Sequence, residues 1–193
     1  MNFVYYRLPH TQQVFRGVMR KGPEELASLA ELNGRRGFVI APFAPSDDCP
    51  ILLLDVEWKP MELPADTMAE ASLVDADFAK EQESYAIDFE NFHAQLRDGT
   101  FSKIVLARSA RLTATEDVSP LTLFARACRR YPRMFVALFS TERSGTWLVA
   151  TPEVLVRGRC DEMRTMALAG TMRLTEDQLS FDTEGGCVSE ADI

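Results

Sequence analysis

Apolar positions at helical spacing predict two long helices. The first runs over residues 77–98, and Gly99 directly after it is a typical helix stop. The second opens at Ser119 and Pro120, because proline is favoured in a first helical turn, and it ends at Tyr131 and Pro132. The residues predicted to face the core are Phe78, Tyr85, Phe89, Phe92 and Leu96 in the first helix, and Leu121, Phe124, Ala125 and Cys128 in the second.

Shorter apolar runs bounded by glycine, proline and polar residues predict strands. Two lie within residues 2–20, and the others span 37–41, 51–58, 104–112, 134–140, 145–150, 154–158 and 163–168. A short helix is predicted to begin around Pro23, with acids in its first turn, and to stop at Asn33 and Gly34. Strands in hairpins beside long helices predict the α+β class, with an antiparallel sheet flanked by helices.

Composition then narrows the function classes. The 193 residues carry a formal net charge of −8 and no basic stripe, which argues against nucleic-acid binding. No apolar run approaches the roughly 18 residues of a membrane span, and the N-terminus lacks a secretory pattern. The four cysteines form no Cys-x-x-Cys pair, so a zinc site is not expected. We expect a cytoplasmic protein with reduced thiols.

Three segments carry candidate chemistry. They read FSKIVLAR over residues 101–108, GTWLVATPEVLV over 145–156 and TMALAGTMR over 165–173. In this order and spacing they resemble the chorismate-binding enzymes, which include isochorismate, salicylate, anthranilate and aminodeoxychorismate synthases. The resemblance covers about residues 78–175 and is strongest to isochorismate synthases of the menaquinone or siderophore type. It implies part of the anthranilate-synthase-like fold, and chorismate as the substrate.

The resemblance gives an acid and a base to this sequence. Isochorismate synthesis adds water at one ring carbon and expels a hydroxyl from another, so it needs both. By resemblance Lys103 is the general base and Glu153 the general acid, and we expect them to face a common cleft. Desolvation by the neighbouring apolar strands would favour the neutral amine of Lys103, which can accept a proton, and the neutral carboxylic acid of Glu153, which can donate one. Taken alone, Lys103 is equally typical of a surface lysine at a strand end, and Glu153 of an exposed turn glutamate.

The third segment resembles the family's contact with the substrate carboxylate and ring. Its residues here are Leu168, Ala169, Gly170 and Thr171. Glycine allows backbone N–H groups to approach an anion closely, and the threonine hydroxyl adds a donor. Taken alone, the same residues are typical of a tight turn after a strand.

Two positions separate the subfamilies by resemblance. Anthranilate synthases typically carry glutamine where Lys103 stands, since their nucleophile is ammonia. Aminodeoxychorismate synthases typically carry lysine where Ala169 stands. The sequence therefore favours isochorismate synthase. Two alternatives stay open: a fragment of a salicylate or anthranilate synthase-type enzyme, and a non-catalytic module that associates with itself through an exposed sheet.

The resemblance divides the chain into three parts. Residues 1–75 correspond to the family's divergent N-terminal region, 76–175 to the start of the catalytic domain, and 176–193 to an atypical tail that we expect to be disordered. The intact family uses Mg²⁺, whose carboxylate ligands would lie beyond residue 193. We therefore expect no metal ligand in this chain, and an isochorismate synthase truncated to its N-terminal half.

From this division we predict that the 193-residue chain alone neither turns over chorismate nor binds magnesium tightly. Magnesium needs several well-placed oxygen ligands, which the sequence does not supply by resemblance. Calorimetric titration with magnesium and chorismate, beside a coupled isochorismate assay, checks this. Micromolar magnesium binding or measurable turnover would show that the site is complete within these residues.

Overall fold

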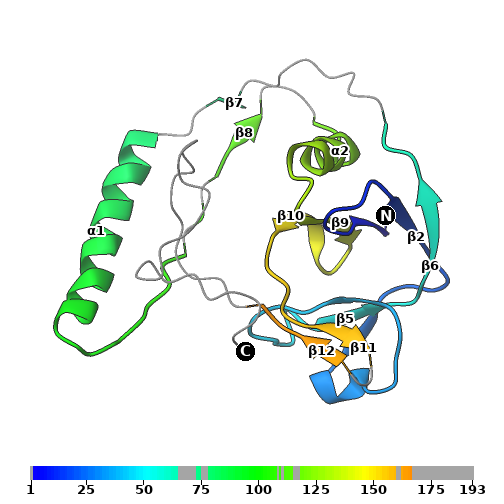
Figure 1. Cartoon of the computed structure of the whole chain (residues 1–193), viewed down its shortest axis with the longest axis horizontal. Helices are drawn as coiled ribbons and strands as arrows, with labels where there is room; N and C mark the ends of the chain where they lie inside the picture. Colours follow the sequence, from blue (N-terminus) through cyan, green and yellow to red (C-terminus); the bar gives the residue numbers. More distant parts are fainter. Residues whose placement is uncertain are drawn as a thin grey trace. The chain divides into compact units, whose positions relative to one another are not determined.

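The computed structural model describes residues 2–64, 73–74, 78–107, 109, 111–114, 118–159 and 162–166. The chain divides into two compact units, Met1–Asp66 with Pro120–Ile193, and Thr67–Ser119. Every strand pair is antiparallel, and the predicted α+β class is confirmed (Figure 1). The first unit holds β1 (Phe3–Arg7), β2 (Val14–Met19), β3 (Glu24–Leu26), the 3-10 helix η1 (Leu29–Leu32), β4 (Phe38–Ile40), β5 (Ile51–Leu54), β6 (Val56–Met61), α2 (Pro120–Arg130), β9 (Phe135–Thr141), β10 (Gly145–Thr151), β11 (Arg157–Arg159) and β12 (Glu162–Arg164). The second holds β7 (Leu73–Val74), α1 (Phe78–Arg97) and β8 (Thr113–Ala114).

A five-stranded sheet in the order β10-β9-β1-β2-β6 forms the centre of the first unit. Its middle strand, β1, pairs with the neighbouring β2 on one side and with the distant β9 on the other. His10 lies between β1 and β2 with φ at 59°, the left-handed conformation that a turn often requires. The two strands predicted within residues 2–20 and those predicted over 134–140 and 145–150 are thereby confirmed.

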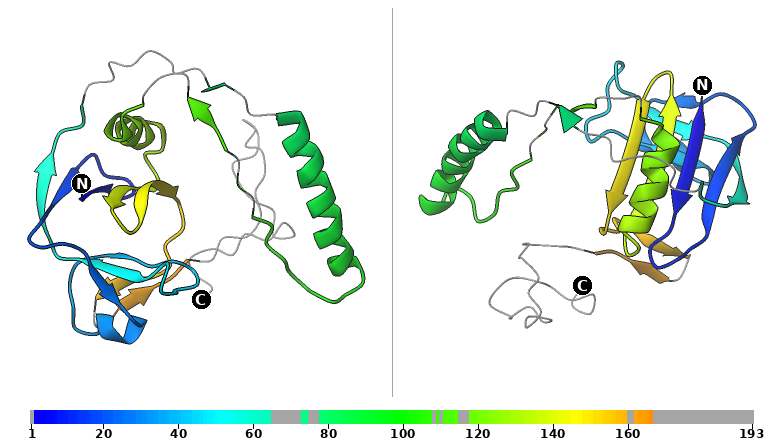
Figure 2. Two further views of the ribbon diagram at one scale, coloured as in Figure 1. Left: turned by 180° about the vertical axis from the view of Figure 1, so that it is seen from behind. Right: turned by 90° about the horizontal axis from the view of Figure 1, so that it is seen from above.

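Helix α2 covers one face of this sheet (Figure 2). It begins at Pro120 and ends before Tyr131, as predicted, and it buries Phe124, Ala125, Ala127 and Cys128. Phe124 is fully buried against alternate residues of the strands, Val14, Val136 and Leu138. The apolar residues that alternate along the strands and those at helical spacing along α2 thus form one apolar layer.

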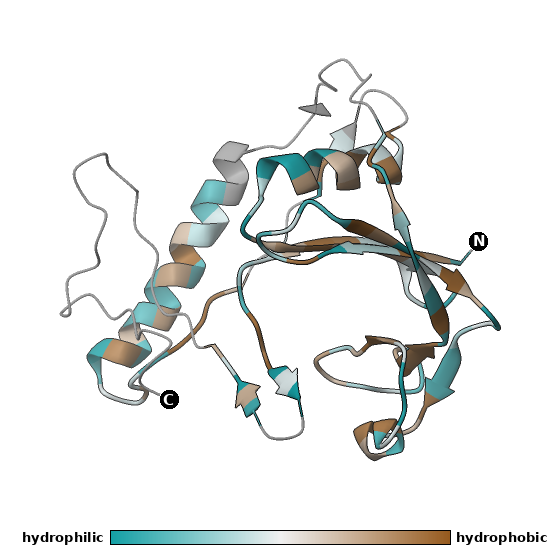
Figure 3. Cartoon of the chain, turned by 45° about the vertical axis from the view of Figure 1, so that its right-hand side comes forward, coloured by the Kyte–Doolittle hydropathy of each residue, from teal (hydrophilic) through white to brown (hydrophobic). Residues whose placement is uncertain are grey.

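The opposite face of the large sheet packs on a three-stranded sheet in the order β3-β5-β4. Strand β5 is buried on both of its faces, which explains its continuous apolar run (Figure 3). Leu52 and Leu54 join Val4 between the two sheets, while Ile51 and Leu53 join Leu26 on the outer side.

A buried arginine ties β1 to the end of α2. Arg7 is 2% exposed, and its guanidinium donates hydrogen bonds to five backbone carbonyl oxygens. Three of them belong to Tyr131 (2.6 Å), Pro132 (2.8 Å) and Met134 (2.9 Å), where the chain leaves α2. A cation at a helix C-terminus also interacts favourably with the helix dipole. Arg7 takes part in no ion pair among the described residues, so carbonyl groups replace the hydration of its two terminal nitrogens, while its buried Nε has no hydrogen-bond partner among them.

The predicted short helix near Pro23 is wrong at its start. Residues 24–26 form β3 instead, because they pair with β5. The helix is the single turn η1, and Glu31 defines where it begins by accepting hydrogen bonds from the N–H groups of Ala27 (2.9 Å) and Ser28 (3.1 Å). Asn33 and Gly34 end it, as predicted.

Four other predicted strands differ from the structure. The strand expected over residues 51–58 is two strands, since the chain passes at Asp55 from the small sheet to the large one. The strands expected over 154–158 and 163–168 are the short β11 and β12, and residues 167 and 168 lie outside the described part. In the strand expected over 104–112, the described residues 104–107, 109, 111 and 112 are not in a strand, although Ile104 and Leu106 are half-buried.

Helix α1 confirms the predicted helix over residues 77–98 almost to its ends. Within its own unit, the aromatic residues of α1 do not form the closed core that the sequence led us to expect, because Phe89 and Phe92 remain 46% and 36% exposed. Phe89 contacts Tyr85 and stacks on His93, with ring centroids 6.2 and 5.5 Å apart. Among the helices in the described residues, none is long and apolar enough to cross a membrane.

Gly17 provides a test of how closely the side chains of neighbouring strands pack on the large sheet. A Cβ atom at Gly17 would lie 2.5 Å from Val4 Cγ1 and 3.1 Å from the Trp58 ring. We predict that Gly17→Ala lowers the free energy of unfolding by about 1–3 kcal/mol, the usual cost of overpacking. Gly22→Ala is the matched control, because no atom lies within 4 Å of its Cβ position. Urea unfolding followed by tryptophan fluorescence measures both, and equal effects would contradict the packing described.

Arg7 provides a test of the tie between β1 and α2. Lysine keeps the charge but carries three donors on one nitrogen, so it cannot reach the same set of carbonyl groups. We predict that Arg7→Lys lowers the free energy of unfolding by about 3 kcal/mol, as expected when charge-assisted hydrogen bonds are lost and carbonyl groups stay buried. Arg16→Lys, at an exposed position of β2, is the control. An unchanged urea midpoint for Arg7→Lys would show that the tie contributes little.

Candidate active site

Lys103 lies in the second unit, just beyond the end of α1. The chain leaves the helix through Gly99, whose φ is 76°, while the Phe101 N–H donates to the Gln95 carbonyl oxygen (3.1 Å). The Thr100 N–H donates to the Asp98 carboxylate at 2.9 Å. Hydrogen bonds from Thr100 hold the pKa of Asp98 below its usual value. This turn brings the chain to Lys103, whose side chain is exposed.

Glu153 lies in the first unit, directly after β10. The Thr151 hydroxyl accepts a hydrogen bond from the Glu153 N–H at 3.1 Å, which forms a tight turn around Pro152. The Glu153 side chain is exposed. The end of a central-sheet strand thus fixes the backbone of the predicted acid.

The residues after Glu153 are fastened to the start of the third segment. The Met166 N–H donates to the Val154 carbonyl oxygen at 3.1 Å, and the Thr165 hydroxyl donates to the Leu155 carbonyl oxygen at 2.6 Å. The structure therefore brings together two of the three segments singled out in the sequence. The predicted substrate contacts Leu168, Ala169, Gly170 and Thr171 follow at once along the chain and lie outside the described residues, as does the tail 176–193.

The expected partial burial of the acid and the base is not provided by the described residues, because both side chains are exposed. Lys103 and Glu153 belong to different units, each of which is described by itself. A common cleft for the pair therefore stays a prediction.

A metal site is not assembled by the described residues. They contain no group of three or more His, Cys, Asp or Glu side chains that could hold a metal ion. Because magnesium requires several oxygen ligands at one point, this part of the chain does not fit the ion by itself. We accordingly assign no step of the reaction to magnesium.

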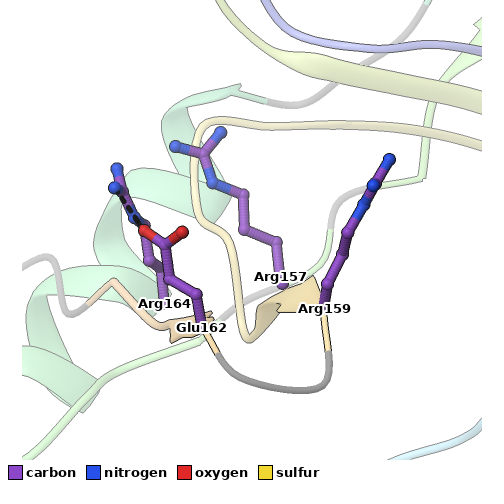
Figure 4. Close-up of a pocket in the computed structure, with 5 residues that line it drawn as sticks. Arg157, Arg159, Glu162 and Arg164 are labelled. Carbon is purple, nitrogen blue, oxygen red and sulfur yellow. Dashed lines mark hydrogen bonds and ion pairs between the residues drawn. The ribbon is translucent and has the colours of Figure 1, made fainter.

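One feature of the first unit escaped the sequence interpretation. The hairpin of β11 and β12 carries three arginines and one glutamate around a hollow of about 430 Å³ (Figure 4). The sequence signal was the alternation Arg157-Gly158-Arg159, which places two like charges on one face of a strand. It went unnoticed because these residues lie between the second and third segments.

Comparison with known protein families shows the family to which this chain belongs. The sequence profile described as "Chorismate binding enzyme" matches residues 57–183, which is more than half of the chain. The chain belongs to the chorismate-binding enzymes. Searches among curated proteins and among solved structures found no match. The family match contains all three segments, together with Lys103 and Glu153, and it begins inside β6.

Family membership makes chorismate the substrate class to consider, and leaves the individual reaction open. Chorismate-binding enzymes differ in the nucleophile that they admit to the ring. The identity of a few side chains near the ring is therefore what distinguishes one member from another.

Proposed function

We propose that this chain carries the acid–base pair of an isochorismate synthase. The family match carries the proposal, because it spans Lys103, Glu153 and the segment over residues 165–173. The attachment of Thr165 and Met166 to the residues after Glu153 supports it, since the predicted acid and the predicted substrate segment share one unit.

In the proposed reaction, the neutral amine of Lys103 takes one proton from a water molecule. The oxygen of that water forms a bond to a ring carbon of chorismate. The double-bond electrons shift, and the ring hydroxyl leaves after accepting a proton from the carboxylic acid of Glu153. One water enters and one water leaves, so chorismate and isochorismate are isomers. The next turnover requires Lys103 to lose its proton and Glu153 to regain one.

Two side chains favour water as the nucleophile. Lys103 stands where anthranilate synthases typically carry glutamine, and a water nucleophile needs a base that ammonia does not. Ala169 stands where aminodeoxychorismate synthases typically carry a nucleophilic lysine, so no covalent intermediate is proposed at that position.

The roles of the pair are tested in an intact isochorismate synthase that carries the corresponding lysine and glutamate. We predict that alanine in place of the lysine, or glutamine in place of the glutamate, lowers kcat about 10²–10⁴-fold, the range for loss of a general acid or base. The lysine variant should lose the fall in rate at low pH, where a general base is protonated, and the glutamate variant the fall in rate at high pH, where a general acid is ionised. An alanine variant at the position of Lys59, an exposed lysine of β6, is the control.

The product identifies the family member. When residues 101–173 of this chain replace the corresponding segment of an intact isochorismate synthase, chromatography of the reaction with chorismate should show isochorismate, without salicylate, and without anthranilate when ammonia is added. Retained turnover in the lysine variant would show that another group activates the water. Salicylate or anthranilate as the main product would refute the assignment.

A further inference from the structure

The hairpin hollow, lined by Arg157, Gly158, Arg159, Glu162 and Arg164, is a concentration of positive charge on a negatively charged protein. Two of its arginines lie on β11, and the third lies with the glutamate on β12. Arg157 is opposite Arg164, and Arg159 is opposite Glu162. Because cross-strand partners and residues two apart share a face, the four charged side chains lie on one side of the hairpin (Figure 4).

Glycine keeps the two strands of this hairpin close together. Gly158 lies between the arginines of β11, and a Cβ there would be 2.0 Å from the Glu162 carbonyl oxygen and 2.8 Å from Met163 Cα. Any side chain at this position would push the strands apart. The spacing of the charged groups therefore depends on Gly158.

The charges of the hollow are only partly balanced. The Glu162 carboxylate accepts two hydrogen bonds from Arg164, from Nε at 3.0 Å and from Nη2 at 2.6 Å. Glu162 thus pairs with Arg164 on its own strand rather than with Arg159 across the hairpin. Neither Arg157 nor Arg159 forms an ion pair with any described residue. The guanidinium groups of Arg157 and Arg159 are therefore without an ionic partner in the part of the chain that the structure describes.

We propose that the hairpin hollow binds a small dicarboxylate through Arg157 and Arg159, with chorismate as its ligand in this protein. Naming chorismate rests on the proposed function, whereas the preference for two carboxylates rests on the hairpin itself. Residues two apart on a strand are separated by about 6.6 Å, which suits two carboxylates of one small molecule better than one compact anion. Each guanidinium matches a carboxylate through two parallel hydrogen bonds.

Charge supports the same conclusion. A dianion approaching a protein of net charge −8 is repelled overall, and a local positive site raises its concentration where it is needed. Thr165 directly follows β12, and its hydroxyl donates a hydrogen bond to the carbonyl oxygen of Leu155, which lies two residues after Glu153. A dicarboxylate bound by the hairpin is therefore held on the unit that carries the predicted acid. The hairpin captures the ligand and takes no part in bond making.

The test uses the full 193-residue chain with chorismate, the monocarboxylate benzoate and inorganic phosphate as probes. Binding is measured by calorimetry, and the arginine Nε–H signals are followed by NMR. We expect Arg157→Gln combined with Arg159→Gln to weaken chorismate binding about tenfold or more, consistent with losing a charge-assisted contact. Arg16→Gln combined with Arg133→Gln removes the same charge from exposed positions of the same unit, and should change binding less than twofold.

Two further variants separate a built site from charge alone. Glu162→Gln removes the competing carboxylate and should tighten chorismate binding, an effect that misfolding cannot produce. Gly158→Ala keeps every arginine but moves the strands apart, and should weaken binding. Equal losses in the two double variants, no gain in Glu162→Gln, or phosphate or benzoate binding as tightly as chorismate would each overturn the proposal.

Failure of this proposal is distinguishable from failure of the proposed function. Lys103→Ala and Glu153→Gln should leave chorismate binding at the arginine signals unchanged. If the product assay refutes isochorismate synthesis, the hairpin still predicts a preference for chorismate over benzoate. If the arginine signals do not respond to chorismate, the hairpin proposal fails whatever the product assay shows.

Discussion

The guanidinium of Arg7 lies where three parts of the first unit meet: the end of β1, the turn after β1 and the exit from α2. Burying a cation requires that polar partners replace its water, and here backbone carbonyl groups do so. Those carbonyl groups belong to segments between the strands and the helix, and those of Leu8, Tyr131 and Pro132 accept a second hydrogen bond from within these segments. One side chain therefore joins five acceptors and holds the helix on the sheet, and the apolar layer around Phe124 depends on that alignment.

This arrangement changes how the N-terminal residues relate to the family domain. By resemblance, residues 1–75 are a divergent region that precedes the catalytic part. In the structure, β1 and β2 are inner strands of the sheet that β9 and β10 complete, and the family match itself begins in β6. Glu153 follows the last residues of β10 by a single turn. The position of the predicted acid is consequently supported by strands from both ends of the chain.

Local patterns predicted those elements whose own residues decide their structure. Helix α2 was predicted to within a residue, because proline, apolar spacing and a second proline all agree. Strand β3 was missed because only its pairing with β5 makes it a strand, and residues 104–107 were predicted as a strand on apolar content alone. For the site, resemblance supplied Lys103 and Glu153, but burial depends on neighbours that a single segment does not reveal. The arginines of the hairpin were overlooked since their proximity arises only when β11 and β12 pair.

The pairing of β1 with β9 has a consequence for synthesis on the ribosome. Val4 and its partner Phe139 are separated by most of the chain, so the middle strand of the sheet emerges long before its second neighbour. Until residues of β9 appear, β1 presents an unpaired edge, and three of the five carbonyl groups that accept hydrogen bonds from Arg7 have not yet been made. Contacts of such large sequence separation form slowly. The nascent chain therefore passes through an extended period in which its first strands are open to association with other chains, and a chaperone that shields strand edges would act at this stage.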